Sequence, residues 1–397
     1  MIAEKMRNLV ANSSVIRKMF EEGKEMAAIY GAENVCDFSL GNPNLAAPDS
    51  VRKALEVIIR EEDPVFLHGY MNNAGYEDVR HAVAASLNRR FDTAFDAKNI
   101  VMTVGAAGGM NVAMKAIINP GDEVVVFAPF FSEYRCYASN VDANLVVVPA
   151  NVPSFIPDVE VAAQYITRKT KMVIINSPNN PTGVVYPEST IIALANMLRE
   201  KQMEFGSEIY IFADEPYREL VYDNSVEVPF LTKYYDNTIV GYSWSKSLSL
   251  PGERIGYLAV SDKIADFEDL MGALNVATRI LGFVNAPSLQ QRMIARCVDE
   301  VADLEFYKKN RDMLYEGLTE AGYECVKPAG AFYLWVKTPV EDDTEFSAFA
   351  KKYQVLCVPG SSFGCSGYIR LSYCVSPETI RTAIPKFKAI WDELHNR

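Results

Sequence analysis

The chain has 397 residues, of which 49% are apolar and 23% are charged, as expected for a globular protein with two or three domains. Its formal net charge of −12 argues against nucleic acid and membrane partners, because an acidic surface repels the phosphates of both. The seven cysteines are scattered, without a CxxC pair, and only three histidines are present, so we expect reduced thiols in a cytoplasmic protein and no metal site.

The N-terminal region is predicted to be helical. The stretch MIAEKMRNLV contains no long apolar segment, so we expect no signal peptide, and later apolar runs are too short to span a bilayer. A helix is predicted from Ser13, with Ser13 or Ser14 as its cap. One face of this helix carries, at helical spacing, Ile16, Met19, Phe20, Gly23, Ala27 and Tyr30. A loop with GNPN at residues 41–44 precedes a second helix predicted over about 49–61.

The middle of the chain has a different pattern, with short β-branched runs between residues 100 and 260. There are seven such runs: IVMTV, EVVVFA, LVVV, KMVIIN, IYIFAD, TIVGYS and IGYLAV. Most are continuously apolar, which is typical of strands that are covered on both faces. Helical segments lie between several of them, for example over 106–118 and 188–201. This alternation predicts an open, mostly parallel α/β sheet.

After about residue 285 the chain becomes helical again, through LQQRMIARCVDEVADLEFYKKNRDMLYEGL. Shorter strand-like pieces follow, AFYLWV, VLCVPG and YIRLSY, and an amphipathic helix closes the chain. These elements predict a second, smaller α+β unit, to which we also assign the N-terminal helix.

Polar residues follow four strands of the predicted sheet, at the edge where such sheets bind ligands. GAAGG, residues 105–109, opens a helix whose free N–H groups can bind an anion, although such a turn is commonly structural. Its spacing matches neither GxGxxG nor a Walker loop, which argues against a dinucleotide or nucleoside triphosphate. SPNNPTG, DEPY and SWSKS follow three other strands. Turns, a helix cap and a solvated lysine explain each one alone, but together they indicate a site.

The stretch YSWSKSLSLPGERIGY places Lys246 among small polar neighbours, eight residues before Arg254. Lysine is a poor core residue and offers no turn geometry. Most lysines are solvated charges, but the flanking serines and the nearby arginine favour a reactive amine here.

Seven motifs occur in a fixed order over nearly the whole chain: HGYMNNAG, VGAAGG, SPNNPTG, DEPY, SWSKSLSLPGERIGY, PAGAFYLW and GYIRLSY. Together they resemble the fold type I, pyridoxal-5′-phosphate-dependent aminotransferases of class I/II, which include aspartate aminotransferases. The resemblance implies a large cofactor-binding domain with a mostly parallel seven-stranded sheet between helices, at residues 48–284. Residues 1–47 and 285–397 would form the smaller α+β domain. It also implies a homodimer with a shared active site.

The resemblance assigns the residues around the cofactor ring. Lys246 would form the Schiff base with the cofactor aldehyde and then move a proton between the substrate α-carbon and cofactor C4′. Asp214 would pair with the pyridine nitrogen and keep it protonated. Tyr217 and Asn180 would donate hydrogen bonds to the phenolic oxygen and lower the pKa of the aldimine. Phe131 would stack on the ring, with simple core packing as the alternative.

The resemblance also assigns the phosphate and substrate contacts. The side chains of Ser243, Ser245 and Arg254 would hold the phosphate. The backbone at Gly105, Ala106 and Ala107 and Tyr70 of the neighbouring subunit would complete this phosphate site.

Arg370 would clamp the substrate α-carboxylate together with Gly41 and Asn180, because a bare charge among apolar neighbours is costly. An internal ion pair is the alternative. Arg279 lies near the segment from which aspartate-specific relatives supply a second arginine across the dimer. Its spacing to the following Asn-x-Pro differs by one, and a solvated or interface arginine is the alternative.

The implied function is transfer of the amino group of an L-amino acid to a 2-oxo acid by a ping-pong mechanism through the Lys246 aldimine. Aspartate, glutamate, alanine and aromatic amino acids are the candidate donors, and 2-oxoglutarate is the default acceptor. A pyridoxal-phosphate-dependent C–S β-lyase or decarboxylase is the first alternative, because it would use the same lysine. NNPTG and Arg370 favour transamination. A non-enzymatic amino-acid-sensing domain is a distant alternative, since no basic helix-turn-helix precedes Ser13.

Overall fold

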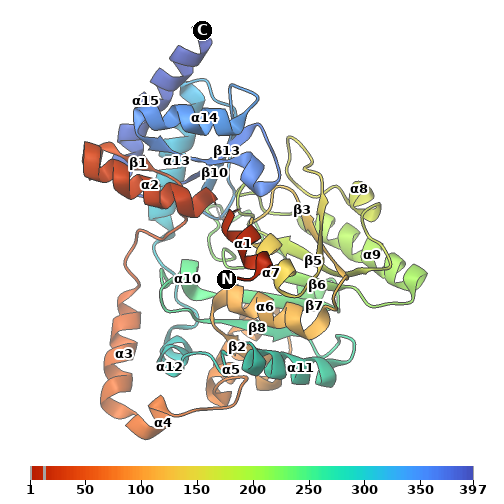
Figure 1. Ribbon diagram of the computed structural model, residues 1–397. Helices are drawn as coiled ribbons and strands as arrows, with labels where there is room; N and C mark the ends of the chain where they lie inside the picture. Colours follow the sequence, from red (N-terminus) through yellow and green to blue (C-terminus); the bar gives the residue numbers. More distant parts are fainter. Residues whose placement is uncertain (1, 12–14, 397) are drawn as a thin grey trace.

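A computed structural model describes residues 2–11 and 15–396 of the chain. The polypeptide forms two parts, each built around its own sheet (Figure 1). Helices pack on both faces of a seven-stranded sheet in the larger part, and the smaller part combines α2 (Val15–Tyr30) with the C-terminal segment. None of the helices within the described ranges is long and apolar enough to cross a membrane.

The large sheet contains all seven predicted strands, and the predicted fold class is confirmed. In spatial order its strands are β2 (Ile100–Thr103), β8 (Gly256–Val260), β7 (Thr238–Ser243), β6 (Tyr210–Asp214), β5 (Thr170–Asn176), β3 (Glu123–Phe127) and β4 (Asn144–Val148). Only β8 runs antiparallel to its neighbours, β2 and β7. The other pairs are parallel. Most of the strand residues are buried, as the continuous apolar runs predicted.

The two faces of this sheet are covered by different helices because strand side chains alternate between faces. Val124 and Val126 of β3 pack in one core with α6 (Gly105–Ile117) and α11 (Phe267–Ile280). Val125 of the same strand packs in the opposite core. The helices on that second face are α3 (Asp49–Glu61), α5 (Glu77–Phe91), α9 (Glu188–Phe205) and α12 (Ser288–Cys297).

Shorter helices complete the large part. They are α4 (Pro64–His68), α7 (Tyr134–Asn140), α8 (Val159–Ala163), α10 (Trp244–Ser247) and the 3₁₀ turns η2 (Ala97–Asn99) and η3 (Leu231–Lys233). The helix predicted over 188–201 continues to Phe205, because Gly206 in the left-handed conformation is the residue that ends it.

The small part has a four-stranded sheet in the order β12 (Val358–Pro359), β13 (Tyr368–Ser372), β10 (Tyr333–Lys337) and β9 (Cys325–Val326). A two-stranded sheet joins β1 (Cys36–Asp37) to β11 (Val355–Leu356). The remaining elements are α2 (Val15–Tyr30), α13 (Leu304–Glu320), α14 (Asp343–Ala350), α15 (Pro377–His395), η1 (Ala32–Asn34), η4 (Lys351–Tyr353) and η5 (Gly360–Phe363). The N-terminal helix α1 (Glu4–Ala11) was predicted to belong to this part, but it lies beside α7 of the large part, where Lys5 pairs with Asp142 at 2.9 Å (Figure 1). The predicted caps Ser13 and Ser14 lie outside the described residues.

The core contacts of α12 argue for a later division between the two parts than the sequence suggested. Met293, Ile294 and Cys297 belong to the core around the large sheet, although residues from 285 onward were predicted to join the small domain. We therefore propose that the division falls after Cys297.

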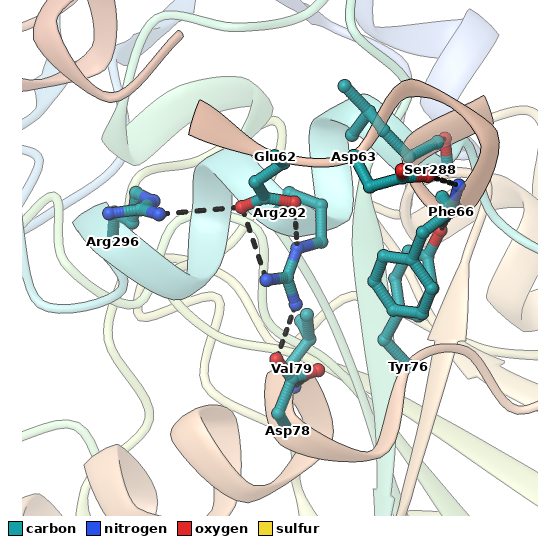
Figure 2. A network of polar contacts seen from close by, with 10 residues as sticks. Glu62, Asp63, Phe66, Tyr76, Asp78, Val79, Ser288, Arg292 and Arg296 are labelled. Atoms are coloured by element: carbon teal, nitrogen blue, oxygen red, sulfur yellow. Dashed lines mark hydrogen bonds and ion pairs between the residues drawn. The ribbon is translucent and has the colours of Figure 1, made fainter. Parts of the chain in front are cut away.

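An ion-pair network fixes α12 in this position (Figure 2). Arg292 donates from Nε to Oε2 of Glu62 at 2.8 Å and from Nη2 to Oε1 at 3.1 Å, and it also contacts Asp78 at the start of α5. Arg296 reaches Glu62 from one turn further along α12, at 3.4 Å. A two-pronged arginine–carboxylate pair is both strong and directional. It joins α12 to the end of α3 and the start of α5.

Candidate active site

A cavity of about 270 Å³ lies where the large sheet meets the small part. It opens at the carboxyl ends of β5, β6 and β7, whose register places Asn176 opposite Asp214 and Asp214 opposite Gly241. Twelve of the predicted site residues line it: Gly41, Ala106, Ala107, Phe131, Asn180, Asp214, Tyr217, Ser243, Ser245, Lys246, Arg254 and Arg370. The sheet therefore brings the predicted strand-end groups together.

Lys246 is held at the cavity by α10, a short helix that directly follows β7. Its Nζ donates a hydrogen bond to the backbone carbonyl of Gly41 at 2.6 Å. The pKa of this amine is lowered to about 8, mainly by burial; Cys374 acts against this shift, and the nearby Arg370 and Arg254 add to it. A substantial fraction of Lys246 is therefore neutral near physiological pH, and a neutral amine is a nucleophile.

Asp214 ends β6 and is 7% exposed. The Tyr134 hydroxyl donates to Oδ2 of Asp214 at 2.5 Å, while Oδ1 has no hydrogen bond within the described part of the chain. The pKa of Asp214 is raised to about 7, mainly by burial; the Tyr134 hydrogen bond acts against this shift, and Glu215 adds to it. Asp214 thus offers an acceptor oxygen to a cationic group in the cavity.

Tyr217 and Asn180 lie beside these groups, and each forms one side-chain hydrogen bond within the site. The Tyr217 and Tyr333 hydroxyls are 2.7 Å apart. The Asn180 side-chain oxygen accepts a hydrogen bond from Arg370 Nη1 at 3.0 Å. Its side-chain N–H group has no partner among the residues that the structure describes, so it can donate to a ligand.

The N-terminus of α6 and Arg254 form an anion-binding arrangement. Gly105 has φ +67°, and a Cβ there would lie 2.5 Å from Nη2 of Arg254, so the chain needs glycine at this close approach. Arg254 forms no ion pair with any described residue, and Ser243 donates to Ser245 at 3.2 Å nearby. Nη1 of Arg254 donates to the Pro251 carbonyl at 3.1 Å, which leaves its other N–H groups for a ligand. Helix N–H groups, hydroxyls and a guanidinium without an ion-pair partner in the described chain suit a phosphate.

Arg370 on β13 is a buried cation, 2% exposed. Nη1 bonds Asn180, Nη2 donates to the Ser39 carbonyl at 2.5 Å, and Nε has no partner in the described ranges. The alternative of an internal ion pair is not supported, because no carboxylate of the described chain pairs with it. Its guanidinium lies 4.6 Å from the Tyr333 ring centre. Because a buried cation without a counter-ion is costly, Arg370 is suited to bind a carboxylate.

Three predicted site residues do not line the cavity. Gly105 lies behind Arg254 and shapes the site through the backbone. Tyr70 is 93% exposed, and Arg279 is exposed near the end of α11. The roles of Tyr70 and Arg279 across a dimer stay predictions.

The sequence reasoning missed Tyr134 and Tyr333. Both line the cavity, and each bonds a residue that was predicted, Asp214 and Tyr217 respectively. Tyr333 lies in PAGAFYLW, a quoted motif from which no residue was chosen. Tyr134 follows Phe131 by three residues, and the two rings meet edge to face at 5.6 Å. One turn of spacing from a predicted ring contact could have identified it.

Comparisons with known proteins agree with this geometry. The family described as aminotransferase class I and II matches residues 33–387. The crystal structure of an amino transferase from Eubacterium rectale is similar, with a TM-score of 0.96, 46% identity and 99% of each chain covered. An aspartate aminotransferase from Thermus thermophilus with maleate has a TM-score of 0.87 at 25% identity, over 98% of this chain and 100% of that one. A probable N-acetyl-LL-diaminopimelate aminotransferase of Bacillus subtilis is 31% identical, over 90% of this chain and 89% of that protein.

Proposed function

This chain belongs to the class I and II aminotransferase family and is an aminotransferase, and from that premise we propose that it works with pyridoxal 5′-phosphate bound at Lys246. The observation that supports the proposal is the convergence of an amine, a carboxylate and an anion-binding helix end on one cavity. The amine is Lys246, the carboxylate is Asp214, and the helix end is that of α6 beside Arg254.

The residues present fit this cofactor group by group. Arg254, Ser243, Ser245 and the start of α6 would hold the phosphate. Asp214 would accept the ring N–H, while Tyr217 and Asn180 would donate to the phenolic oxygen. Pyridoxal phosphate supplies an aldehyde that reacts with amines and a ring that takes up negative charge from the substrate α-carbon.

The chain's own groups then carry and position the proton. Nζ of Lys246 takes the proton when the amine is neutral, and the Gly41 carbonyl orients that amine through its hydrogen bond. Arg370 and Asn180 hold the substrate carboxylate.

We also propose a homodimer in which Tyr70 reaches the partner's phosphate and Arg279 reaches the partner's substrate. Exposed apolar side chains on α3 and α4 support a partner surface next to Tyr70: Ile59 at 69%, Val65 at 83% and Phe66 at 55%. All seven cysteines are free, which supports a reducing, cytoplasmic location.

Trapping the cofactor tests the assignment of Lys246. Protein loaded with pyridoxal phosphate and reduced with borohydride should yield a single labelled peptide that contains Lys246, as mapped by mass spectrometry. In parallel, L-amino acids and 2-oxoglutarate should give L-glutamate and the matching 2-oxo acid. Label on another lysine would contradict the proposal. Release of pyruvate with ammonia would favour a β-lyase, and release of an amine with carbon dioxide would favour a decarboxylase.

Replacing Arg370 by lysine should raise the KM for the amino acid by about 10- to 100-fold, because lysine keeps the charge but loses the two-pronged grip on a carboxylate. The dissociation constant of pyridoxal phosphate should stay within about twofold, since Arg370 is assigned to the substrate carboxylate and not to the cofactor. Steady-state kinetics and a cofactor titration measure the two effects. Arg381→Lys, on the exposed side of α15, is the matched control. An unchanged KM in the Arg370 variant would remove the proposed carboxylate clamp.

A further inference from the structure

Tyr134 has no role in the function described so far, although it contacts the residue assigned to the cofactor ring. It begins α7, it is buried, and its hydroxyl donates to Oδ2 of Asp214 at 2.5 Å. In the described chain this is the one hydrogen bond that the Asp214 carboxyl group receives. Because the buried Tyr134 hydroxyl bonds this one carboxylate oxygen, the contact can influence how Asp214 functions.

Ring packing fixes the position of this hydroxyl. The Tyr134 ring stacks against Phe130, with centroids 6.5 Å apart and planes 12° apart, and it meets Phe131 edge to face at 88°. The backbone N–H of Tyr134 donates to the Phe131 carbonyl at 3.1 Å. The hydroxyl therefore cannot leave Asp214 without moving three packed rings.

The surroundings of Asp214 otherwise favour its neutral form. Burial and the neighbouring Glu215 both raise the pKa of Asp214, and the Tyr134 hydrogen bond acts against them. The neighbouring Tyr137 and Tyr217 have pKa values raised above their usual range by burial, so they carry no charge at neutral pH. The pKa of Tyr134 is also raised well above its usual value, so it stays protonated and remains a donor.

We propose that Tyr134 is a positioning residue for amino transfer: its hydroxyl holds Oδ2 of Asp214, keeps this carboxylate charged and leaves Oδ1 as the acceptor for the ring nitrogen. The inference rests on the proposed function, because it requires pyridoxal phosphate with its ring nitrogen at Asp214. It extends the predicted ring contact of Asp214, at the end of β6, to a second residue, Tyr134 on α7.

Two measurements on Tyr134→Phe, neither of them activity, test the proposal. The dissociation constant of pyridoxal phosphate should rise about 10-fold or more, the usual effect of removing a hydrogen bond to a charged group. With pyridoxal phosphate labelled by ¹⁵N in its ring, the chemical shift should move from the protonated toward the unprotonated position. Tyr235→Phe is the matched control. It removes a buried hydroxyl that donates to the Ile209 carbonyl at 2.8 Å, away from the cavity, and should leave both readouts unchanged.

A double-mutant cycle tests whether Tyr134 acts through Asp214. In an Asp214→Asn background, Tyr134→Phe should change the dissociation constant by less than about twofold, because there is no charge left to support. An effect of the same size in both backgrounds would overturn the inference, as would a wild-type dissociation constant and ¹⁵N shift in Tyr134→Phe alone.

Wild-type protein separates this inference from the proposed function. If wild type fails to bind pyridoxal phosphate at Lys246, the proposed function fails. If wild type binds it and Tyr134→Phe behaves as wild type, only the role of Tyr134 fails. Should the Phe variant not fold, 4-aminophenylalanine at position 134 keeps a weaker donor in the same place. It should weaken binding by an intermediate factor, and no weakening there would also overturn the inference.

Discussion

Replacing Lys246 by alanine should slow amino transfer by about 10⁴-fold or more, because the variant loses both the nucleophile and the group that moves the proton. The phosphate contacts at Arg254, Ser243 and Ser245 are untouched, so pyridoxal phosphate should still bind. Single-turnover kinetics with an amino acid donor would measure the loss of rate, and equilibrium dialysis would measure retention of the cofactor.

Two comparisons test whether the loss of rate is specific to the Lys246 amine. Lys98→Ala removes an exposed lysine that pairs loosely with Asp262, and it should leave the rate unchanged. Small primary amines added to Lys246→Ala should restore part of the rate, because the missing atom is an amine next to an open cavity. Retention of more than about a tenth of the wild-type rate would remove Lys246 from the centre of the mechanism.

Replacing Asp214 by asparagine should lower kcat/KM by about 10³-fold, because a neutral amide cannot keep a proton on the ring nitrogen. The amide oxygen can still accept from Tyr134, so the packing around position 214 should survive. A pH-independent loss of kcat/KM, measured with wild-type protein in parallel, is the expected result. A loss of less than about tenfold would argue that Asp214 does not act on the ring.

The same substitution should stabilise the protein without cofactor. The pKa of Asp214 rises from 3.8 to about 7 on folding, so ionisation is disfavoured in the folded state. The free energy of unfolding therefore falls as the pH rises from about 4 to about 7, and Asp214 accounts for at most about 4 kcal/mol of this fall. Urea unfolding should therefore give Asp214→Asn a higher free energy of unfolding than wild type at pH 8. The difference should be much smaller at pH 4.

Asp343→Asn is the control of opposite sign for this stability effect. Oδ2 of Asp343 accepts backbone N–H bonds from Ser361 at 3.0 Å and Gly367 at 2.9 Å, so this buried carboxylate is already satisfied within the fold. Its replacement should destabilise the protein at pH 8. If Asp214→Asn is less stable than wild type at pH 8, the buried Asp214 carboxylate does not cost the protein stability, and the interpretation is wrong.

The sheet was predictable because its strands are covered on both faces. Runs such as KMVIIN and IYIFAD contain almost nothing but apolar residues, and the side chains of β5 and β6 are indeed buried. Once the parallel sheet was expected, the rule that ligands bind at its carboxyl edge placed Asn180, Asp214 and Lys246 together.

Features that depend on contacts between distant segments were not predictable in the same way. The helical pattern of α12 shows an apolar face but not which core receives it, and the partners Glu62 and Asp78 of Arg292 are more than 200 residues away. Tyr134 was missed for a similar reason, since its partner Asp214 lies 80 residues further along. The roles of Tyr70 and Arg279 require a second subunit, and one chain's sequence carries no geometry for it.

The hydrogen bond from Lys246 to Gly41 links the reactive amine to the segment that enters the large part from the small one. A Cβ at position 41 would lie 2.1 Å from the Tyr333 hydroxyl, so this backbone is wedged between β10 and the amine. The position of the amine therefore depends on how the small part packs against the large one.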